Sequence, residues 1–162
     1  METFGMELIE KIQEAFTSKG LRLSVAESAT AGLLSHMLTS LPGASAFFDS
    51  SVVAYSAESK KNLLGIKKSF IEKHGVISEE TARAMSEAVR DKTGSDFSLA
   101  VTGNTGPVAM EDKRVGLIFI SVSHREVTTS RGFIFSGSRD EVRRLAAVAA
   151  IEFLYEAVEA YS

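Results

Sequence analysis

The sequence of 162 residues contains no cysteine, no tryptophan and only two prolines. Without cysteine there are no disulfide bonds, no thiolate metal sites and no cysteine nucleophile, and such a composition is compatible with a cytoplasmic protein. The three histidines, His36, His74 and His124, lie far apart, and none belongs to a metal-binding pattern such as HExxH. The sequence therefore predicts no metal site.

Long apolar runs and a strong charge of one sign are missing as well. No apolar stretch approaches the roughly 18 residues that span a bilayer, and the segment METFGMELIEK lacks the layout of a signal peptide. A net charge of −3 gives no general attraction to nucleic acid or to acidic membranes, so an anionic ligand requires a local basic cluster. With 44% hydrophobic and 24% charged residues, the chain 1–162 is expected to form one globular domain.

Helical and strand-like patterns alternate along the chain and end in a β-hairpin and a long helix. Apolar periodicity and helix stop signals predict helices at 3–19, 29–41, 56–65, 79–93 and 142–160. Runs rich in β-branched and aromatic residues predict strands at 21–26, 46–55, 96–103, 114–123 and 128–137, the last two as a hairpin. This order predicts a three-layer α/β/α sandwich on a mixed, mostly parallel five-stranded sheet with one antiparallel strand.

Polar residues follow three of the predicted strands at the points where each strand ends. These residues are Glu27 and Ser28, Tyr55 and Ser56, and the segment 103–107. Ligands of open α/β sheets bind beyond the carboxyl ends of parallel strands. If the three strands are parallel neighbours, the three segments form one crevice.

Ser28 has two possible roles. A serine where a strand meets a helix is usually an N-cap, whose oxygen accepts a hydrogen bond from the first helical turn. The same position also offers unpaired N–H groups and the positive end of a helix dipole, which can hold an oxyanion, and small residues at 29–32 leave room for a substrate. A nucleophilic serine needs an adjacent base, and no histidine is evidently placed to act as one.

Lys60, in the segment YSAESK, is the candidate base. At a reference pKa near 10.4, only about one lysine in a few thousand is neutral at pH 7. Half of the molecules are neutral at pH 7 only if the pKa falls by ~3.4, which corresponds to about 4.6 kcal/mol and which burial can supply. An exposed lysine could not act in this way. Tyr55 either steers the proton or the substrate, or is a half-buried aromatic of the strand.

Two further segments are candidate ligand sites. The loop TGNTGP carries Gly103 and Gly106, which permit close backbone approach, although it is neither a GxGxxG nor a Walker motif. Arg139 and Arg143, four residues apart, share one face at the start of the last helix, in the segment that opens with the capping box SRDE. These arginines are either solvated side chains or grip a phosphate at the helix terminus.

Five separated motifs together resemble the C-terminal domain of the bacterial competence/damage-inducible protein CinA. They are VAESATAGLLSHMLTSLPGASAFFDSSVVAYSAESKKNLLGI, HGVISEETARAMSEAV, AVTGNTGP, VG and SGSRDEVRRLAAVAAIEFL. The resemblance extends in order, with similar gaps, from about residue 5 to residue 160. Stand-alone members of this family are nicotinamide-nucleotide amidohydrolases.

The resemblance implies deamidation of nicotinamide mononucleotide to nicotinate mononucleotide and ammonia, in the same α/β/α fold, without metal or cofactor. It implies a small-molecule nucleotide substrate and self-association of the chain. The family's nucleophilic serine falls on Ser28 and its lysine on Lys60, the expected base, with Tyr55 beside them. The expected substrate-binding residues are Glu27, Thr30, Gly32, Gly103, Thr105, Gly106, Arg139 and Arg143.

Two segments depart from the family pattern. Ala57 stands where the family has the asparagine of Tyr-Ser-Asn, so a side-chain amide is deleted. In the 107–112 loop, Val108, Ala109 and Met110 replace three glycines. Two alternatives to the deamidase therefore stay open: a catalytically silent module that binds a nucleotide or a partner, and an amidase for a different amide.

Overall fold

The computed structural model describes residues 3–161, and the side chains of residues 5–161. Five strands form one sheet with the order β2-β1-β3-β4-β5. β1 (Leu23–Glu27) pairs in parallel with β2 (Phe48–Val53) and with β3 (Phe97–Gly103). β4 (Leu117–His124) pairs antiparallel with β3 and with β5 (Val127–Ile134). Four strands therefore run in one direction and β4 runs against them, which confirms the predicted sheet.

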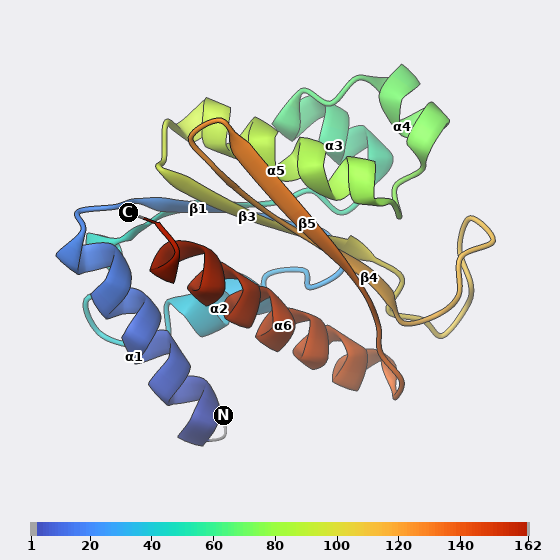
Figure 1. The fold of residues 1–162 in the computed structure, drawn as a ribbon. Helices are drawn as coiled ribbons and strands as arrows, with labels where there is room; N and C mark the ends of the chain where they lie inside the picture. Colours follow the sequence, from blue (N-terminus) through green and yellow to red (C-terminus); the bar gives the residue numbers. More distant parts are fainter. Residues whose placement is uncertain (1–2, 162) are drawn as a thin grey trace.

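Helices cover both faces of this sheet (Figure 1). One face carries α1 (Thr3–Ser18), α2 (Leu33–Leu38) and α6 (Arg139–Glu159), and the other carries α3 (Ala57–Leu64), α4 (Lys68–His74) and α5 (Glu79–Thr93). The predicted three-layer α/β/α sandwich is thus confirmed. The sequence patterns did not predict α4 or the short 3₁₀ helix η1 (Ala44–Ala46).

The larger apolar core lies between the sheet and the layer of α1, α2 and α6. Its centre is aromatic, since the ring of Phe16 lies 5.6 Å from that of Phe47 and 5.4 Å from that of Phe97. The apolar periodicity of the helix predicted at 3–19 places Phe4, Leu8, Ile12 and Phe16 in one stripe. Ile12 and Phe16 of this stripe are fully buried, whereas the side chain of Phe4 lies outside the described residues. The stripe therefore anchors α1 on the sheet.

A smaller apolar core lies on the opposite face, below α3 and α5. This core contains the alanines Ala26 of β1, Ala100 of β3 and Ala54, which directly follows β2. Small side chains let the helices approach the sheet closely, and α3 brings the buried Lys60 into this layer. This packing positions the candidate site.

The helix predicted at 29–41 is shorter than expected. Residues 29–32 form turns, and α2 begins only at Leu33 and ends at Leu38. The reason is the backbone conformation, because Ala31 and Gly32 have positive φ angles of 47° and 95°, which a right-handed helix cannot contain. Gly32, and not Ser28, occupies the N-cap position of α2.

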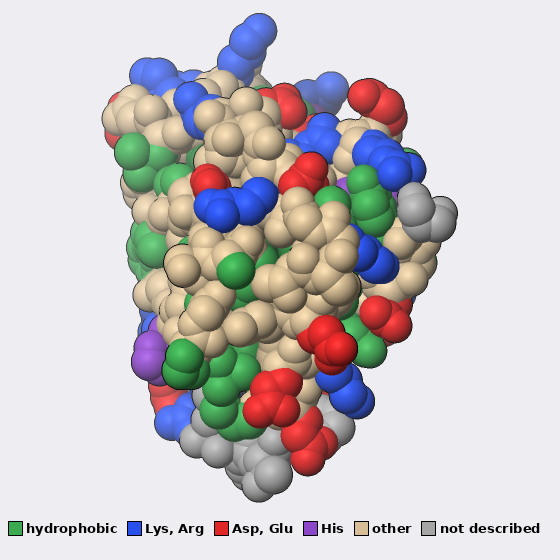
Figure 2. Space-filling model, turned by 90° about the vertical axis from the view of Figure 1, so that its left-hand side faces the viewer, with side chains coloured by type: hydrophobic (Ala, Val, Ile, Leu, Met, Phe, Trp, Pro, Cys, Tyr) green, Lys and Arg blue, Asp and Glu red, His purple; other side chains and the backbone are tan. Residues whose placement is uncertain are grey.

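The face shown in Figure 2 carries Lys and Arg side chains interspersed with Asp and Glu side chains. Charges of the two signs are therefore mixed on this face instead of gathering into a patch of one sign. Among the helices of residues 3–161, none is both long enough and apolar enough to cross a membrane.

Candidate active site

The carboxyl ends of β1, β2 and β3 bring the predicted site segments to one edge of the sheet. The backbone N–H of Ser28, just after β1, donates to the carbonyl of Val101 in β3 at 2.9 Å. On the other side of β1, the N–H of Ala54, just after β2, donates to the carbonyl of Glu27 at 2.8 Å. Ser28 is therefore flanked on both sides by the strands whose ends carry the other candidate residues.

Ser28 and Lys60 lie in direct contact. The Nζ atom of Lys60 is 2.9 Å from the Oγ atom of Ser28 and 3.0 Å from the carbonyl oxygen of Ala54. The carbonyl of Tyr55 lies 3.5 Å from the same Nζ atom and 3.4 Å from Ser28 Oγ. Lys60 is 0% exposed and Ser28 only 7% exposed. The two side chains are therefore as close together and as well shielded from solvent as a Ser/Lys dyad requires.

The local sequence of α3 fixes the position of Lys60. The side chain of Ser56 accepts a hydrogen bond from the N–H of Ser59, and the hydroxyl of Ser59 accepts from the N–H of Ser56, so a capping box starts the helix. Gly65, with a positive φ of 72°, ends it. Lys60 and Leu64, four residues apart, form the buried face of this short helix. A lysine at the fourth helical position is thus directed into the protein.

Burial changes the acidity of this amine. Removal from water lowers the pKa of Lys60 from 10.5 to about 8, and the nearby negative charge of Glu111 opposes this change. At pH 7 about one Lys60 side chain in ten is then neutral, against about one in a few thousand for an ordinary lysine. Lys60 is therefore able to accept a proton near neutral pH.

Ser28 does not cap a helix, so the cap interpretation and the expected helix dipole at Ser28 are both wrong. The N–H groups at the start of α2 are bound instead by the buried carboxylate of Glu27. It accepts from the N–H of Gly32 at 2.9 Å, of Leu34 at 3.2 Å and of Ser35 at 2.9 Å. Thr30 donates its hydroxyl to the same carboxylate at 2.6 Å, and the hydroxyl of Ser35 donates as well.

The turn after Ser28 offers a different place for an oxyanion. Among residues 3–161, the backbone N–H groups of Ala29, Thr30 and Thr105 have no hydrogen-bond acceptor. Ala29 and Thr30 directly follow Ser28, and Thr105 lies in the loop after β3. Unpaired donors next to a nucleophile are the groups that an oxyanion hole requires.

The two candidate arginines reach the site from the start of α6. Arg139 donates to the hydroxyl of Tyr55 at 2.7 Å and to the carbonyl of Gly106. Arg143 donates to the carbonyl of Thr30 at 3.1 Å, while its Nε atom is buried without a partner among the described residues. Both guanidinium groups therefore lie over segments that surround Ser28.

Two residues that the sequence patterns do not predict as site residues hold the loop after β3. The side chain of Asn104 accepts from the N–H of Gly106 at 2.9 Å and donates to the carbonyl of Lys113 at 3.4 Å. The carboxylate of Glu111 accepts from the N–H groups of Val76 at 2.8 Å and Ile77 at 3.0 Å. An asparagine beside glycine is a known turn signal, but no local signal predicts the contact of Glu111 across the fold.

Apart from Thr105, whose backbone N–H group is described above, the predicted site residues fall into three groups. The structure brings Ser28, Lys60, Tyr55, Thr30, Gly106, Arg139 and Arg143 together at the sheet edge. Glu27 and Gly32 are engaged in capping α2. Gly103 is constrained by packing, since a Cβ there would lie 2.5 Å from the carbonyl oxygen of Leu117. The catalytic and binding roles themselves stay predictions.

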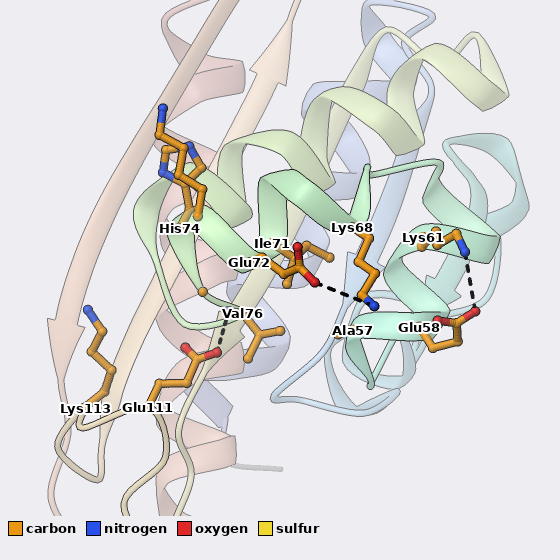
Figure 3. Close-up of a pocket in the computed structure, with 12 residues that line it drawn as sticks. Ala57, Glu58, Lys61, Lys68, Ile71, Glu72, His74, Val76, Glu111 and Lys113 are labelled. Atoms are coloured by element: carbon orange, nitrogen blue, oxygen red, sulfur yellow. Dashed lines mark hydrogen bonds and ion pairs between the residues drawn. The ribbon is translucent and has the colours of Figure 1, made fainter.

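Cavities lie on either side of this site. One of about 530 Å³ lies among α3, α4 and the loop with Glu111, and Ala57 lines it (Figure 3). Ion pairs between Lys61 and Glu58 and between Lys68 and Glu72 lie along its wall. A second cavity of about 800 Å³ lies among α1, α2 and α6. Ser28 and Lys60 line neither of the two.

Residues 3–161 contain no group of three or more His, Asp or Glu side chains placed to hold a metal ion.

Fold and site together define a class: α/β/α sandwiches with a serine and a buried lysine at the carboxyl edge of a mixed sheet. The family model of the CinA C-terminal domain matches residues 6–158. The chain therefore belongs to the CinA C-terminal domain family.

Relatives in bacteria agree with this assignment. A CinA-like protein of Geobacter metallireducens is 38% identical over 151 residues, which cover 93% of this chain and 37% of the relative. A CinA-like protein of Geotalea daltonii is 41% identical over 140 residues, which cover 86% of this chain and 34% of the relative. The chain thus spans little more than a third of the length of these curated relatives.

Solved structures share the fold over nearly their whole length. The competence damage-inducible protein A of Klebsiella pneumoniae superposes with a TM-score of 0.94 at 30% identity, covering 98% of this chain and 99% of that chain. The competence/damage inducible protein CihA of Agrobacterium tumefaciens gives a TM-score of 0.92, also at 30% identity, with 98% of both chains covered.

Proposed function

We propose that this protein is an amidohydrolase that converts nicotinamide mononucleotide to nicotinate mononucleotide and ammonia. The observation that carries the proposal is the contact of 2.9 Å between Ser28 Oγ and the buried Nζ atom of Lys60. A hydroxyl beside an amine with a pKa of about 8 is an activated nucleophile near neutral pH. The resemblance to stand-alone nicotinamide-nucleotide amidohydrolases supplies the substrate.

In the first half-reaction the neutral amine of Lys60 takes the proton of Ser28 as Oγ attacks the amide carbon. The carbonyl oxygen becomes an oxyanion, for which the N–H groups of Ala29, Thr30 and Thr105 are the available donors. The Lys60 ammonium, held by the carbonyls of Ala54 and Tyr55, then gives its proton to the leaving nitrogen. The carbon–nitrogen bond breaks, and ammonia departs from an acyl-enzyme.

In the second half-reaction a water molecule attacks the acyl carbon while Lys60 takes the proton of this water. Collapse of the second oxyanion breaks the bond to Oγ, which recovers its proton from Lys60. Nicotinate mononucleotide leaves, and both residues return to their starting states.

The positive groups at the start of α6 support a phosphorylated substrate. Arg139 and Arg143 provide a local basic cluster in a chain of net charge −3. Guanidinium groups at a helix N-terminus are suited to binding a phosphate. The nucleotide phosphate is accordingly assigned to these two arginines.

An amidase for a different amide is the second candidate, because the loop after β3 differs from the family pattern. Val108 is 72% and Met110 52% exposed at the tip of this loop. Bulky apolar side chains in place of glycines can contact a substrate other than a mononucleotide. A panel of amides, including free nicotinamide and aliphatic amides, separates the two candidates.

The test is ammonia release from nicotinamide mononucleotide by the purified chain and two variants. Ser28→Ala and Lys60→Met each remove one member of the pair, and methionine fills the space of the lysine stem. We expect both variants to fold, as judged by circular dichroism, and to lose at least about 1,000-fold in kcat. Turnover like that of the wild type in either variant disproves the dyad. Binding of the nucleotide without ammonia release by the wild type supports a silent binding module instead.

A further inference from the structure

We propose that Arg139 is a specificity-determining residue, whose side chain closes the entrance above Ser28 until the phosphate of a substrate draws it aside. The inference rests on the proposed amidase function and predicts that this amidase prefers phosphorylated amides. Arg139 thus does more than bind phosphate, since its resting position blocks substrates that lack this group.

The order of the strands places the Arg139 side chain across the site. β1 lies between β2 and β3 in the sheet. Arg139 contacts the hydroxyl of Tyr55, just after β2, and the carbonyl of Gly106, in the loop after β3. The two segments that Arg139 joins lie on either side of the end of β1, where Ser28 lies.

The reactive pair is shielded in this arrangement. Ser28 is 7% exposed and Lys60 is fully buried, and neither lines the cavity of about 530 Å³ or that of about 800 Å³ beside the site. Tyr55, by contrast, is 54% exposed, and Arg139 itself is exposed. An anion in solvent can therefore reach the guanidinium group before anything reaches Ser28.

The charge of Arg139 is not neutralised by the protein. Among the ion pairs of residues 3–161, none includes Arg139. The neighbouring acids are engaged elsewhere, because Asp140 pairs with Arg144 at 2.7 Å and Glu141 accepts from the N–H of Ser138 at 2.7 Å. Arg139 also occupies the first turn of α6, where the helix dipole disfavours a cation.

A phosphate dianion is a better partner than the two present ones. The carbonyl of Gly106 and the hydroxyl of Tyr55 are neutral acceptors, whereas hydrogen bonds between guanidinium and phosphate are charge-assisted and can be bidentate. When the Arg139 guanidinium group exchanges these two neutral acceptors for a phosphate, its side chain no longer closes the entrance above Ser28. An amide without a phosphate offers no such exchange.

The experiment compares nicotinamide mononucleotide with nicotinamide riboside, which has the same amide without the phosphate. The variants are Arg139→Ala and, as a matched control from the same helix, Arg144→Ala. We expect Arg139→Ala to lose activity on the mononucleotide and to gain about tenfold on the riboside, because loss of one hydrogen bond to a charged group is of that order. Inorganic phosphite is expected to raise riboside turnover by the wild type and to have no effect on Arg139→Ala. Arg144→Ala is expected to behave like the wild type.

A second readout does not depend on amide turnover. Phenylmethanesulfonyl fluoride labels reactive serines, and mass spectrometry measures the labelling of Ser28. Faster labelling in Arg139→Ala, and in Tyr55→Phe, which lacks the phenolic acceptor, supports the closed entrance. Equal labelling rates, or an equal loss of both substrates in Arg139→Ala, overturn it. Absence of ammonia from every amide with the wild type would refute the proposed function alone, since the labelling rates still decide whether Arg139 closes the site.

Discussion

At pH 7 the buried amine of Lys60 is charged in most molecules, because its pKa is lowered only to about 8. Burial of Lys60 therefore lowers the stability of the folded chain and at the same time makes the amine a usable base. Its burial disfavours the charged form, and the same burial makes the neutral form accessible to a proton from Ser28. Two measurements follow from this single side chain.

The first is the pH dependence of the reaction. Since only neutral Lys60 accepts a proton, kcat/KM on nicotinamide mononucleotide is expected to rise with pH through an apparent pKa of about 8 and then level off. Glu111→Gln removes the charge that raises the pKa of Lys60, so the midpoint is expected to move to lower pH. Asp112→Asn, at the adjacent position, is the control. A rate that is flat between pH 6 and pH 9 contradicts Lys60 as the base.

The second is the stability of Lys60→Met. Below pH 8 the amine is charged in both folded and unfolded chains, so the folded state bears the full cost of burial, about 3 kcal/mol at 1.36 kcal/mol for each pH unit of the lowered pKa. Between about pH 8 and pH 10.5 the folded chain loses the proton first, and the cost disappears.

Lys60→Met removes this cost together with two hydrogen bonds worth about 1 kcal/mol each. We therefore expect a gain of about 1 kcal/mol in the free energy of unfolding at pH 7 and a loss of the gain at pH 10. Urea denaturation at both pH values measures the difference. A variant less stable than the wild type at pH 7 would show that the hydrogen bonds outweigh the burial cost.

At the scale of single elements, α2 depends on a residue outside the helix. Six residues form it, and a helix of this length is marginal without tertiary support. The carboxylate of Glu27 supplies the missing acceptors at its N-terminus. Ser28 directly follows Glu27, so the same contacts fix the backbone that presents the nucleophile.

Glu27→Gln is expected to lower the free energy of unfolding by about 2–4 kcal/mol, because one amide oxygen cannot replace a carboxylate and the amide nitrogen faces other donors. Glu72→Gln, an exposed residue of α4 in an ion pair with Lys68, is the control and should change stability by less than about 0.5 kcal/mol. Urea denaturation measures both. Equal stabilities of the two variants would mean that α2 does not rely on Glu27.

The elements also show what sequence patterns can predict. The predicted helices 56–65 and 79–93 correspond closely to α3 and α5. Their capping serines, Ser56 and Ser78, and their terminal glycines, Gly65 and Gly94, are signals that act within one turn. The sequence pattern predicts too early a start for α2, because the small residues before it are compatible with a helix. Its true start depends on a carboxylate seven residues away from Leu34. The sequence does not predict α4, because its seven residues give too short an apolar pattern.

At the scale of the whole molecule, the order of helical and strand patterns was sufficient to predict the three layers and the single antiparallel strand. The rule that ligands bind at the carboxyl ends of parallel strands then placed Ser28, Tyr55 and Gly106 at one edge. The positions of Asn104 and Glu111 could not be predicted in this way. Their contacts depend on the path of the loop between β3 and β4, and loop paths are set by tertiary packing.

The position of Arg139 in the first turn of α6 affects the rate at which the entrance above Ser28 can open. α6 packs along the sheet through buried residues such as Val142, Ala146 and Leu154, so its backbone is fixed. The entrance above Ser28 then opens by rotation about the side-chain bonds of one exposed arginine, Arg139. Such rotations take picoseconds to nanoseconds, whereas loops that cover active sites move in microseconds to milliseconds. Access to the site is therefore not expected to limit the turnover of a phosphorylated substrate.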